Sequence, residues 1–317
     1  MRKKLESALS YLEGLKVDYA DIRVHDITDE AYSTEDGRVQ AMIDHRSRGY
    51  GIRVFLGGSM GFAASQDFEK MEQTVRDALA IARASRLAQK RPVKLASRPA
   101  AVDSYRTPVE IDPFSVSKKE KLELLLTADA EMRQAEPGLF KTAGTLDFRR
   151  EEKIFADTEG SYITQEIYHT GGGIKAFAAD GRDRQVRSYP NCFRGNFAAA
   201  GYEFINDMRL VENAAQAARE AAALLKAEEC PSGRFDLVIG SSQMMLQIHE
   251  SVGHAIELDR VLGYEAGYAG TSFLNPGMEG FQYGSEHVNI VADATVPGGL
   301  GTFGYDDEGV PAQRVPI

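Results

Sequence analysis

The sequence predicts an α+β protein of two domains, with a mixed sheet and helices in residues 1–230 and a mainly β domain in residues 231–317. Three observations support this prediction. The chain has 317 residues, a length typical of about two domains. Segments with apolar residues at every second position, typical of half-buried strands, interleave with segments of helical spacing. Pro231-Ser232-Gly233 follows an alanine-rich segment and breaks the pattern, so it is the predicted domain boundary.

The first half of the N-terminal domain is expected to hold a helix, several strands and a second helix. Residues 3–15 show helical spacing, and residues 19–34 alternate between apolar and polar as in a strand with one buried face. Asp36-Gly37 is a strong hairpin signal, so residues 39–44 should return beside that strand. The elements that follow are an alternating strand at Ile52, Val54 and Leu56, a turn at Gly57-Gly58, and a helix from Phe68 to Ala82 closed by Pro92.

The second half begins with a helix that has a recognisable start. Ser117 and Glu120 have the spacing of a capping box, which predicts a helix from there to about Gln134. The remaining predicted elements are strands within residues 141–205, a loop or bulge at Gly171-Gly172-Gly173, and a helix over residues 211–228.

The C-terminal domain is expected to open with a strand that leads into a helix. Phe235–Gly240 reads as a buried strand, and Ser241-Ser242 offers hydroxyl groups that can cap the helix. The helix is largely apolar and should end at Gly263. It carries His249-Glu250-Ser251-Val252-Gly253-His254, two imidazoles and a carboxylate within six residues. Such groups can bind a divalent metal and supply a base beside it.

The five-residue spacing of the two histidines constrains this interpretation. On a regular α-helix, five residues turn the chain by about 500°, so the rings would point roughly 140° apart. A local π-type turn would bring positions i and i+5 onto nearly the same face. Gly253 is a natural place for a helix to deform. Two histidines bound to one metal therefore predict an irregular helix near Gly253.

An ordinary helix gives the alternative interpretation. Glu250 and His254 are four residues apart and could pair with each other, which would leave His249 as an unrelated helix residue. Against this, two histidines and a glutamate in an apolar segment are costly to bury without a partner.

Other potential site residues have weaker patterns. Glu257 and Asp259 could orient the histidines or bind Arg260, or could be solvated charges at a helix end. His287 could line the site, whereas Asp306, Asp307 and Glu308 lack the spaced ligands of a calcium loop. The residues expected to be ordinary surface or core positions are His25, His45, His169, Cys192 and Cys230.

Composition excludes several classes of protein. A formal net charge of −10 and the lack of a basic stripe argue against a nucleic-acid partner. There is no apolar run of the roughly 18 residues that a membrane span needs, so no membrane partner is expected. The N-terminus is not a secretory signal, and two cysteines give no disulfide framework, so a cytoplasmic location is predicted.

The run from His249 through His254 to Glu257, Asp259 and Arg260 resembles the signature of the TldD/PmbA family of metallopeptidases. The resemblance continues in Tyr264-Glu265-Ala266-Gly267, in Asp306-Asp307-Glu308-Gly309 and in Ser47-Arg48-Gly49-Tyr50-Gly51-Ile52-Arg53-Val54, and so spans nearly the whole chain. Because the His-Glu-x-x-x-His motif marks the catalytic subunit of the family, the chain is similar to TldD.

The resemblance implies a zinc-dependent peptidase that acts on unfolded peptides or peptide tails. His249 and His254 would bind zinc, and Glu250 would take a proton from the metal-bound water and pass it to the leaving amine. It also implies a homodimer, or a heterodimer with a PmbA-like subunit. The third ligand in the family is a cysteine near the far C-terminus, expected beyond Ile317. The C-terminal domain is therefore expected to be incomplete, and this chain alone to bind zinc poorly and to have little activity.

Two other functions remain open from the sequence. The chain could be a non-catalytic interaction or regulatory subunit that keeps the fold without the chemistry. It could also be a metal-dependent hydrolase of a non-peptide amide. Metal analysis separates the first from a peptidase, and digestion of a peptide library separates the second.

Overall fold

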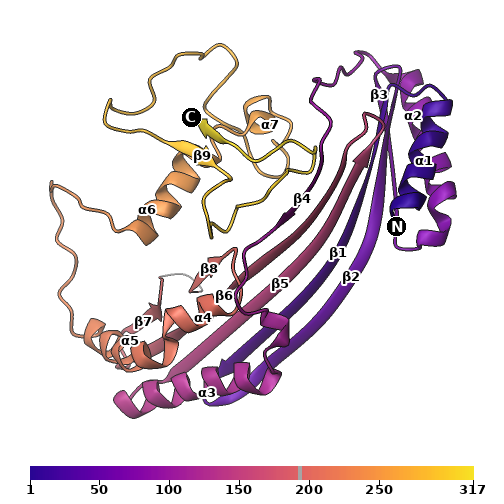
Figure 1. Ribbon diagram of the computed structural model, residues 1–317. Coiled ribbons are helices and arrows are strands. Elements are labelled where there is room, and N and C mark those ends of the chain that lie inside the picture. Colours follow the sequence, from indigo (N-terminus) through magenta and orange to yellow (C-terminus); the bar gives the residue numbers. More distant parts are fainter. Residues whose placement is uncertain (192–194) are drawn as a thin grey trace.

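The computed structural model describes residues 1–191 and 195–317, and its largest feature is a long, curved, eight-stranded sheet (Figure 1). The strand order is β3-β2-β1-β5-β6-β4, and β7 and β8 both pair with β6. Every pairing is antiparallel except that of β4 with β6. The predicted α+β class is confirmed. The strands are β1 Tyr19–Glu35, β2 Arg38–Leu56, β3 Ser59–Ser65, β4 Val102–Arg106, β5 Lys141–Asp157, β6 Tyr162–Ala179, β7 Arg184–Tyr189 and β8 Asn196–Ala198.

The first hairpin forms at the predicted turn. Asp36 and Gly37 have φ angles of 52° and 72°, the left-handed conformation that a two-residue hairpin turn requires of both central residues. The returning strand β2 is one continuous strand of 19 residues, whereas the sequence predicted two short ones. Pairing with β1 from Arg38 to Phe55 supplies backbone hydrogen bonds across the polar stretch that interrupted the apolar pattern.

The helices cover one face of the sheet in two groups (Figure 1). One group packs on Ala20, Ile22 and Val24 at one end of the long strands, and the other packs near Tyr32 at the opposite end. Both groups contact even-numbered residues of β1, which point to the same face of the sheet. The first group is α1 Arg2–Gly14 and α2 Met71–Ala88, and the second is α3 Lys118–Ala135, α4 Glu203–Met208 and α5 Leu210–Leu224. Two 3₁₀ turns, η1 Phe68–Lys70 and η2 Pro113–Ser115, precede α2 and α3.

Helix α3 begins at the predicted cap. The Ser117 hydroxyl accepts a hydrogen bond from the backbone N–H of Glu120 at 3.1 Å, which satisfies an otherwise unpaired donor in the first turn. No described helix is long and apolar enough to cross a membrane.

The glycine run at residues 171–173 was predicted to be a loop or bulge, and this prediction is wrong. All three glycines lie within β6 and pair with β5. A Cβ atom on Gly172 would lie 2.2 Å from the carbonyl oxygen of Thr145, and one on Gly173 would lie 2.6 Å from the Cα of Gly195. These glycines are present because neighbouring backbone approaches too closely for any side chain.

The C-terminal part has less regular structure than predicted. The strand expected at residues 235–240 is not formed, and Leu237 and Val238 are 79% and 97% exposed. A strand needs a neighbouring strand for its backbone hydrogen bonds, and none among the described residues pairs with this segment. The elements present are α6 Ser241–Ile248, a π-helical turn His249–Gly253, α7 Leu258–Val261, and the paired strands β9 Val291–Asp293 and β10 Arg314–Pro316.

A turn at residues 304–309 fastens this C-terminal part to the sheet. Arg53 on β2 contacts Glu308 at 2.5 Å, and Lys153 on β5 contacts Asp307. The Gln165 side chain donates to the carbonyl oxygen of Tyr305 at 2.8 Å and accepts from its N–H at 2.9 Å. These contacts use odd-numbered residues of the sheet, on the face opposite the helices, which is the concave side in Figure 1.

Candidate metal centre

The backbone around His249 departs from a regular α-helix as the spacing predicts. After α6, the N–H of His254 donates to the carbonyl oxygen of His249 at 3.0 Å, a hydrogen bond from residue i+5 to residue i. This bond closes the π turn, the name used below for His249–Gly253. A π turn places residues i and i+5 on nearly the same face. The predicted irregularity near Gly253 is confirmed.

The π turn brings the predicted site residues together. The ring centroids of His249 and His254 are 4.3 Å apart, and one ligand atom from each of His249, Glu250 and His254 lies within 4.8 Å of the other two. Glu250 Oε1 is 3.7 Å from His249 Nε2. The side chains of His249 and Glu250 are exposed, whereas that of His254 is 30% exposed. The cluster is therefore accessible from solvent.

The donor set suits a divalent metal such as zinc. Zinc binds imidazole nitrogen and carboxylate oxygen in tetrahedral sites, where two ligand atoms at about 2.0–2.1 Å from the ion lie roughly 3.3 Å apart. The three ligand atoms of the cluster lie within 4.8 Å of one another, so the side chains would have to move closer together to share an ion. In the part of the chain that the structure describes, this is the one group of three such residues close enough to share an ion.

Two side chains hold the backbone that surrounds the π turn. The Tyr283 hydroxyl donates to the carbonyl oxygen of Ser251 at 2.6 Å, and the Ser272 hydroxyl donates to that of Ala255 at 2.7 Å. These bonds satisfy carbonyl groups close to the point where the helix ends. Neither residue has a sequence signal, because both lie in an irregular segment with no periodicity or motif. Together with Phe273 they border a hollow of about 380 Å³ next to Glu250 and His254.

Glu257 contacts both of its predicted partners. Its Oε1 atom lies 3.1 Å from Nδ1 of His254, and its other carboxylate oxygen contacts Nε of Arg260. The hydrogen bond with His254 is the main cause of a lowered pKa for Glu257, and Arg260 adds to it. Asp259 has a different role, because its carboxylate accepts a hydrogen bond from the backbone N–H of Arg260 at 2.8 Å.

The other described histidines and Cys230 are not part of this cluster. His25 pairs with Glu151 at 2.6 Å on the sheet, and burial lowers the pKa of His169 on β6. His45 lies on β2, and His287 is highly exposed beside Glu286. Cys230 is exposed, and Cys192 lies outside the described residues.

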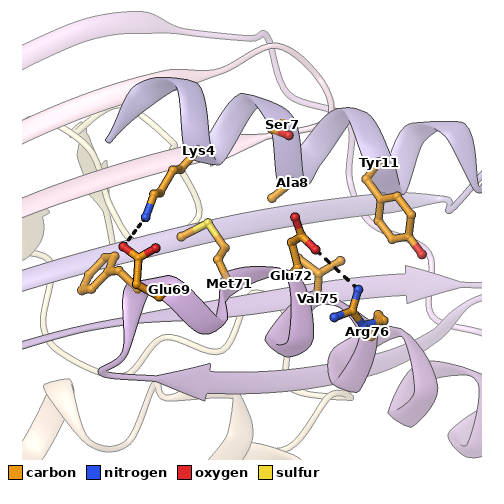
Figure 2. Close-up of a pocket in the computed structure, with 10 residues that line it drawn as sticks. Lys4, Ser7, Ala8, Tyr11, Glu69, Met71, Glu72, Val75 and Arg76 are labelled. Carbon is orange, nitrogen blue, oxygen red and sulfur yellow. Dashed lines mark hydrogen bonds and ion pairs between the residues drawn. The ribbon is translucent and has the colours of Figure 1, made fainter.

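A separate pocket of about 370 Å³ lies between α1, η1 and α2 (Figure 2). Lys4 and Glu69 form an ion pair across it at 2.6 Å, and Glu72 pairs with Arg76 at 3.7 Å. Its walls belong to the helical face of the sheet, so it is distinct from the histidine cluster.

Comparison with known proteins gives a consistent family. Models of the PmbA/TldA metallopeptidase family match residues 20–82 as domain 1, residues 111–227 as the central domain and residues 232–317 as the C-terminal domain.

Curated relatives carry the name metalloprotease. One from Methanocaldococcus jannaschii is 29% identical over 302 residues, covering 95% of this chain and 63% of the relative. One from Methanothermobacter thermautotrophicus is 30% identical over 297 residues, covering 94% and 61%. A TldD homologue from Haemophilus influenzae is 28% identical over 310 residues, covering 94% and 60%. The chain thus spans about three fifths of the length of these relatives.

Solved structures share the fold. A protein from Thermotoga maritima described as a candidate modulator of DNA gyrase superposes with a TM-score of 0.73 at 18% identity, covering 100% of this chain and 68% of that one. TldE from Thermococcus kodakarensis has a TM-score of 0.64 at 16% identity, covering 99% and 67%. Together with the three family models, these similarities lead to one conclusion: the chain belongs to the PmbA/TldD family of metallopeptidases.

Proposed function

We propose that the protein is a zinc-dependent peptidase that hydrolyses peptide bonds in unfolded peptides or peptide tails. The observation that carries the proposal is the π turn, which gathers His249, Glu250 and His254 within 4.8 Å. The names of the relatives support the same chemistry. Because the chain spans about three fifths of their length, the activity, substrate and partners of the whole protein all belong to the proposal.

Each residue of the cluster has a distinct role in this proposal. His249 and His254 hold the metal, which when bound would polarise the scissile carbonyl group and lower the pKa of water. Glu250 accepts a proton from the attacking water and delivers it to the leaving amine. The hydroxyl group of that water adds to the carbonyl carbon, and the carbon–nitrogen bond breaks. Glu250 is 61% exposed, so water reaches its carboxylate freely.

The hollow beside the cluster suits an extended peptide. Phe273 and Tyr283 border it with ring centroids 5.3 Å apart, and Glu250 lies at the same hollow. Aromatic rings of this kind offer apolar contact area to a peptide side chain next to the bond being cut.

The proposal extends to the assembly of the protein. A homodimer, or a heterodimer with a PmbA-like subunit, is proposed because the solved TldE structure shares this fold. A cytoplasmic location stays a prediction from the composition.

Replacing the base tests the proposed chemistry. Glu250→Gln keeps the shape of the side chain and removes the charge that accepts a proton, so peptide cleavage by the full-length protein should fall by roughly 10²- to 10⁴-fold. Zinc content, measured by mass spectrometry after dialysis, should stay near that of the unmodified protein. Glu286→Gln is the matched control, because Glu286 is highly exposed beside His287, away from the cluster, and its loss should leave both quantities unchanged.

The outcomes separate the roles of Glu250 and the alternative functions. Loss of both zinc and cleavage in Glu250→Gln would make Glu250 a ligand, which its distances also permit. Near-normal turnover in that variant would remove Glu250 from the mechanism. Zinc binding with no cleavage of a peptide library, but hydrolysis of simple amides, would favour a non-peptide substrate. Absence of zinc binding in the full-length protein, which would include the third ligand expected beyond Ile317, would favour a non-catalytic subunit.

A further inference from the structure

We infer that Glu257 is a positioning residue, which fixes the ring of His254 so that its Nε2 atom faces the metal. The role rests on the proposed metal site. Glu257 stands three residues after His254, at the start of α7, with an extended backbone (φ −60°, ψ 115°). This conformation ends the helical path after the π turn and lets the carboxylate reach back to Nδ1 of His254 at 3.1 Å.

The contact decides which ring nitrogen is available. A neutral imidazole carries its proton on one nitrogen and a free electron pair on the other. A carboxylate can only accept a hydrogen bond, so it holds the proton on Nδ1 and leaves the electron pair of Nε2 free for a metal. The same carboxylate–histidine arrangement orients the ligands of many zinc sites. His249 has no equivalent hydrogen bond among the described residues. Its neighbour Glu250 lies 3.7 Å from its Nε2 atom, which is beyond hydrogen-bond length.

Glu257 is itself held in place from its far side. Its second carboxylate oxygen contacts Nε of Arg260, and Nη1 of Arg260 donates to the carbonyl oxygen of Ala269 at 2.7 Å. The Arg260 side chain is 18% exposed, so this anchor is largely sheltered from solvent. A line of contacts therefore runs from the ring of His254 to the turn that contains Ala269.

A simple surface ion pair is the competing explanation. Residues three apart near a helix end often pair, and an exposed pair contributes little to stability. That explanation predicts no effect of Glu257 on the tautomer of His254 or on zinc affinity. Those two quantities therefore distinguish a positioning role from a merely structural one.

The test measures both quantities in the same set of variants. Histidine labelled with ¹⁵N reports the tautomer by long-range ¹H–¹⁵N correlation in metal-free protein, at a pH where the ring signals are those of neutral imidazole. His254→Gln identifies the signals of that ring. Zinc affinity is measured by competition with a chromophoric chelator, and thermal unfolding checks that each variant folds.

We expect Glu257→Ala to move the proton of His254 from Nδ1 to Nε2 and to weaken zinc binding about 10- to 100-fold. Glu257→Gln should restore much of both, because its amide oxygen can still accept from Nδ1. Asp259→Asn is the matched control, since Asp259 contacts the backbone of Arg260, and neither quantity should change.

An unchanged tautomer, or zinc affinity within about twofold of the unmodified protein, in a folded Glu257→Ala variant would overturn the inference. If Glu257→Ala fails to fold, the tautomer in Glu257→Gln decides, because a shift to protonated Nε2 there would also overturn it. Zinc affinity is compared in the full-length protein, and failure of that protein to bind zinc would contradict the proposed function instead. The tautomer of His254 in the metal-free protein would still decide the inference about Glu257.

Discussion

Lys121 carries a charged group into the interior of the protein, where its side chain is 0% exposed. Its Nζ atom contacts Glu30 at 2.5 Å and lies 4.5 Å from the ring centroid of Phe148. The Tyr32 hydroxyl donates to the same carboxylate at 2.7 Å. Burial of both charges is tolerated because each has partners, and removal of one would leave the other uncompensated.

Lys121→Met should therefore lower the free energy of unfolding by about 3–5 kcal/mol, as expected when one partner of a buried ion pair is lost. Urea unfolding measures this change. Lys119→Met is the control on the same helix, because its i, i+4 pair with Glu123 is 82% exposed on the lysine side and should contribute at most about 0.5 kcal/mol. A loss below about 1 kcal/mol in Lys121→Met would mean that the Glu30 carboxylate finds another partner.

The π turn is the element on which the site depends. Carbonyl groups in and just after this turn lie outside the regular helix hydrogen bonds. Tyr283 donates to one from 32 residues downstream, and Ser272 donates to the other from 17 residues downstream. The site is thus made by local backbone geometry and stabilised by distant side chains.

Removal of these two hydroxyl groups should loosen the turn. We expect Tyr283→Phe with Ser272→Ala to weaken zinc binding several-fold, at a stability cost of about 1 kcal/mol for each lost hydrogen bond. Chelator competition and thermal unfolding check the two effects. The control is Tyr264→Phe, a highly exposed tyrosine in the same region. Unchanged zinc affinity in the double variant would show that the π turn persists without these bonds.

Local signals in the sequence predicted several elements correctly. The capping box of Ser117 and Glu120, the Asp36-Gly37 hairpin and the π turn each depend on neighbours within a few residues. The π turn could be predicted because two histidines at i and i+5 can bind one metal only if the helix is irregular between them.

Features set by distant parts of the chain could not be predicted. The Gly171-Gly172-Gly173 run lies in a strand because it pairs with β5. Close approach of Thr145 and Gly195 explains the glycines, and neither contact has a sequence signal. The apolar segment at residues 235–240 has strand composition, but composition cannot supply a pairing partner. Ser272 and Tyr283 were missed because a hydroxyl that caps a distant carbonyl follows no periodicity.

At the scale of the whole molecule, the acidic turn at residues 304–309 joins the part that carries the histidines to the concave face of the sheet. The hydrogen bond from Arg53 is the main cause of a lowered pKa for Glu308. Burial alone would raise the pKa of Asp307, but the hydrogen bond and charge of Lys153 outweigh it and keep that pKa low. Charge pairing therefore stabilises the attachment.

The attachment should weaken in acid. A carboxylate whose pKa is lowered by folding stabilises the folded state above its unfolded pKa, about 4.3 for glutamate, and that contribution is lost as the pH falls through the folded value. Burial raises the pKa of the neighbouring Asp21, which gives the opposite slope, so the test compares the protein with Glu308→Gln.

The unfolding free energy of the unmodified protein should exceed that of Glu308→Gln by about 1 kcal/mol or less at pH 7, because Glu308 is 52% exposed. The difference should begin to shrink below about pH 4.3, the unfolded pKa of glutamate, and should approach zero as the pH falls below the lowered pKa of Glu308 in the folded protein. Urea unfolding at a series of pH values measures it. A difference that stays constant from pH 7 to about pH 3 would remove the charge of Glu308 from the attachment.

X-ray absorption at the zinc edge of the zinc-loaded protein tests most directly whether one metal joins His249 and His254. Two imidazole nitrogens at about 2.0–2.1 Å from the zinc are predicted, with one fewer in His249→Ala and in His254→Ala. A spectrum that fits at most one imidazole, or that is the same in the unmodified protein and in both variants, would contradict a shared metal at the π turn.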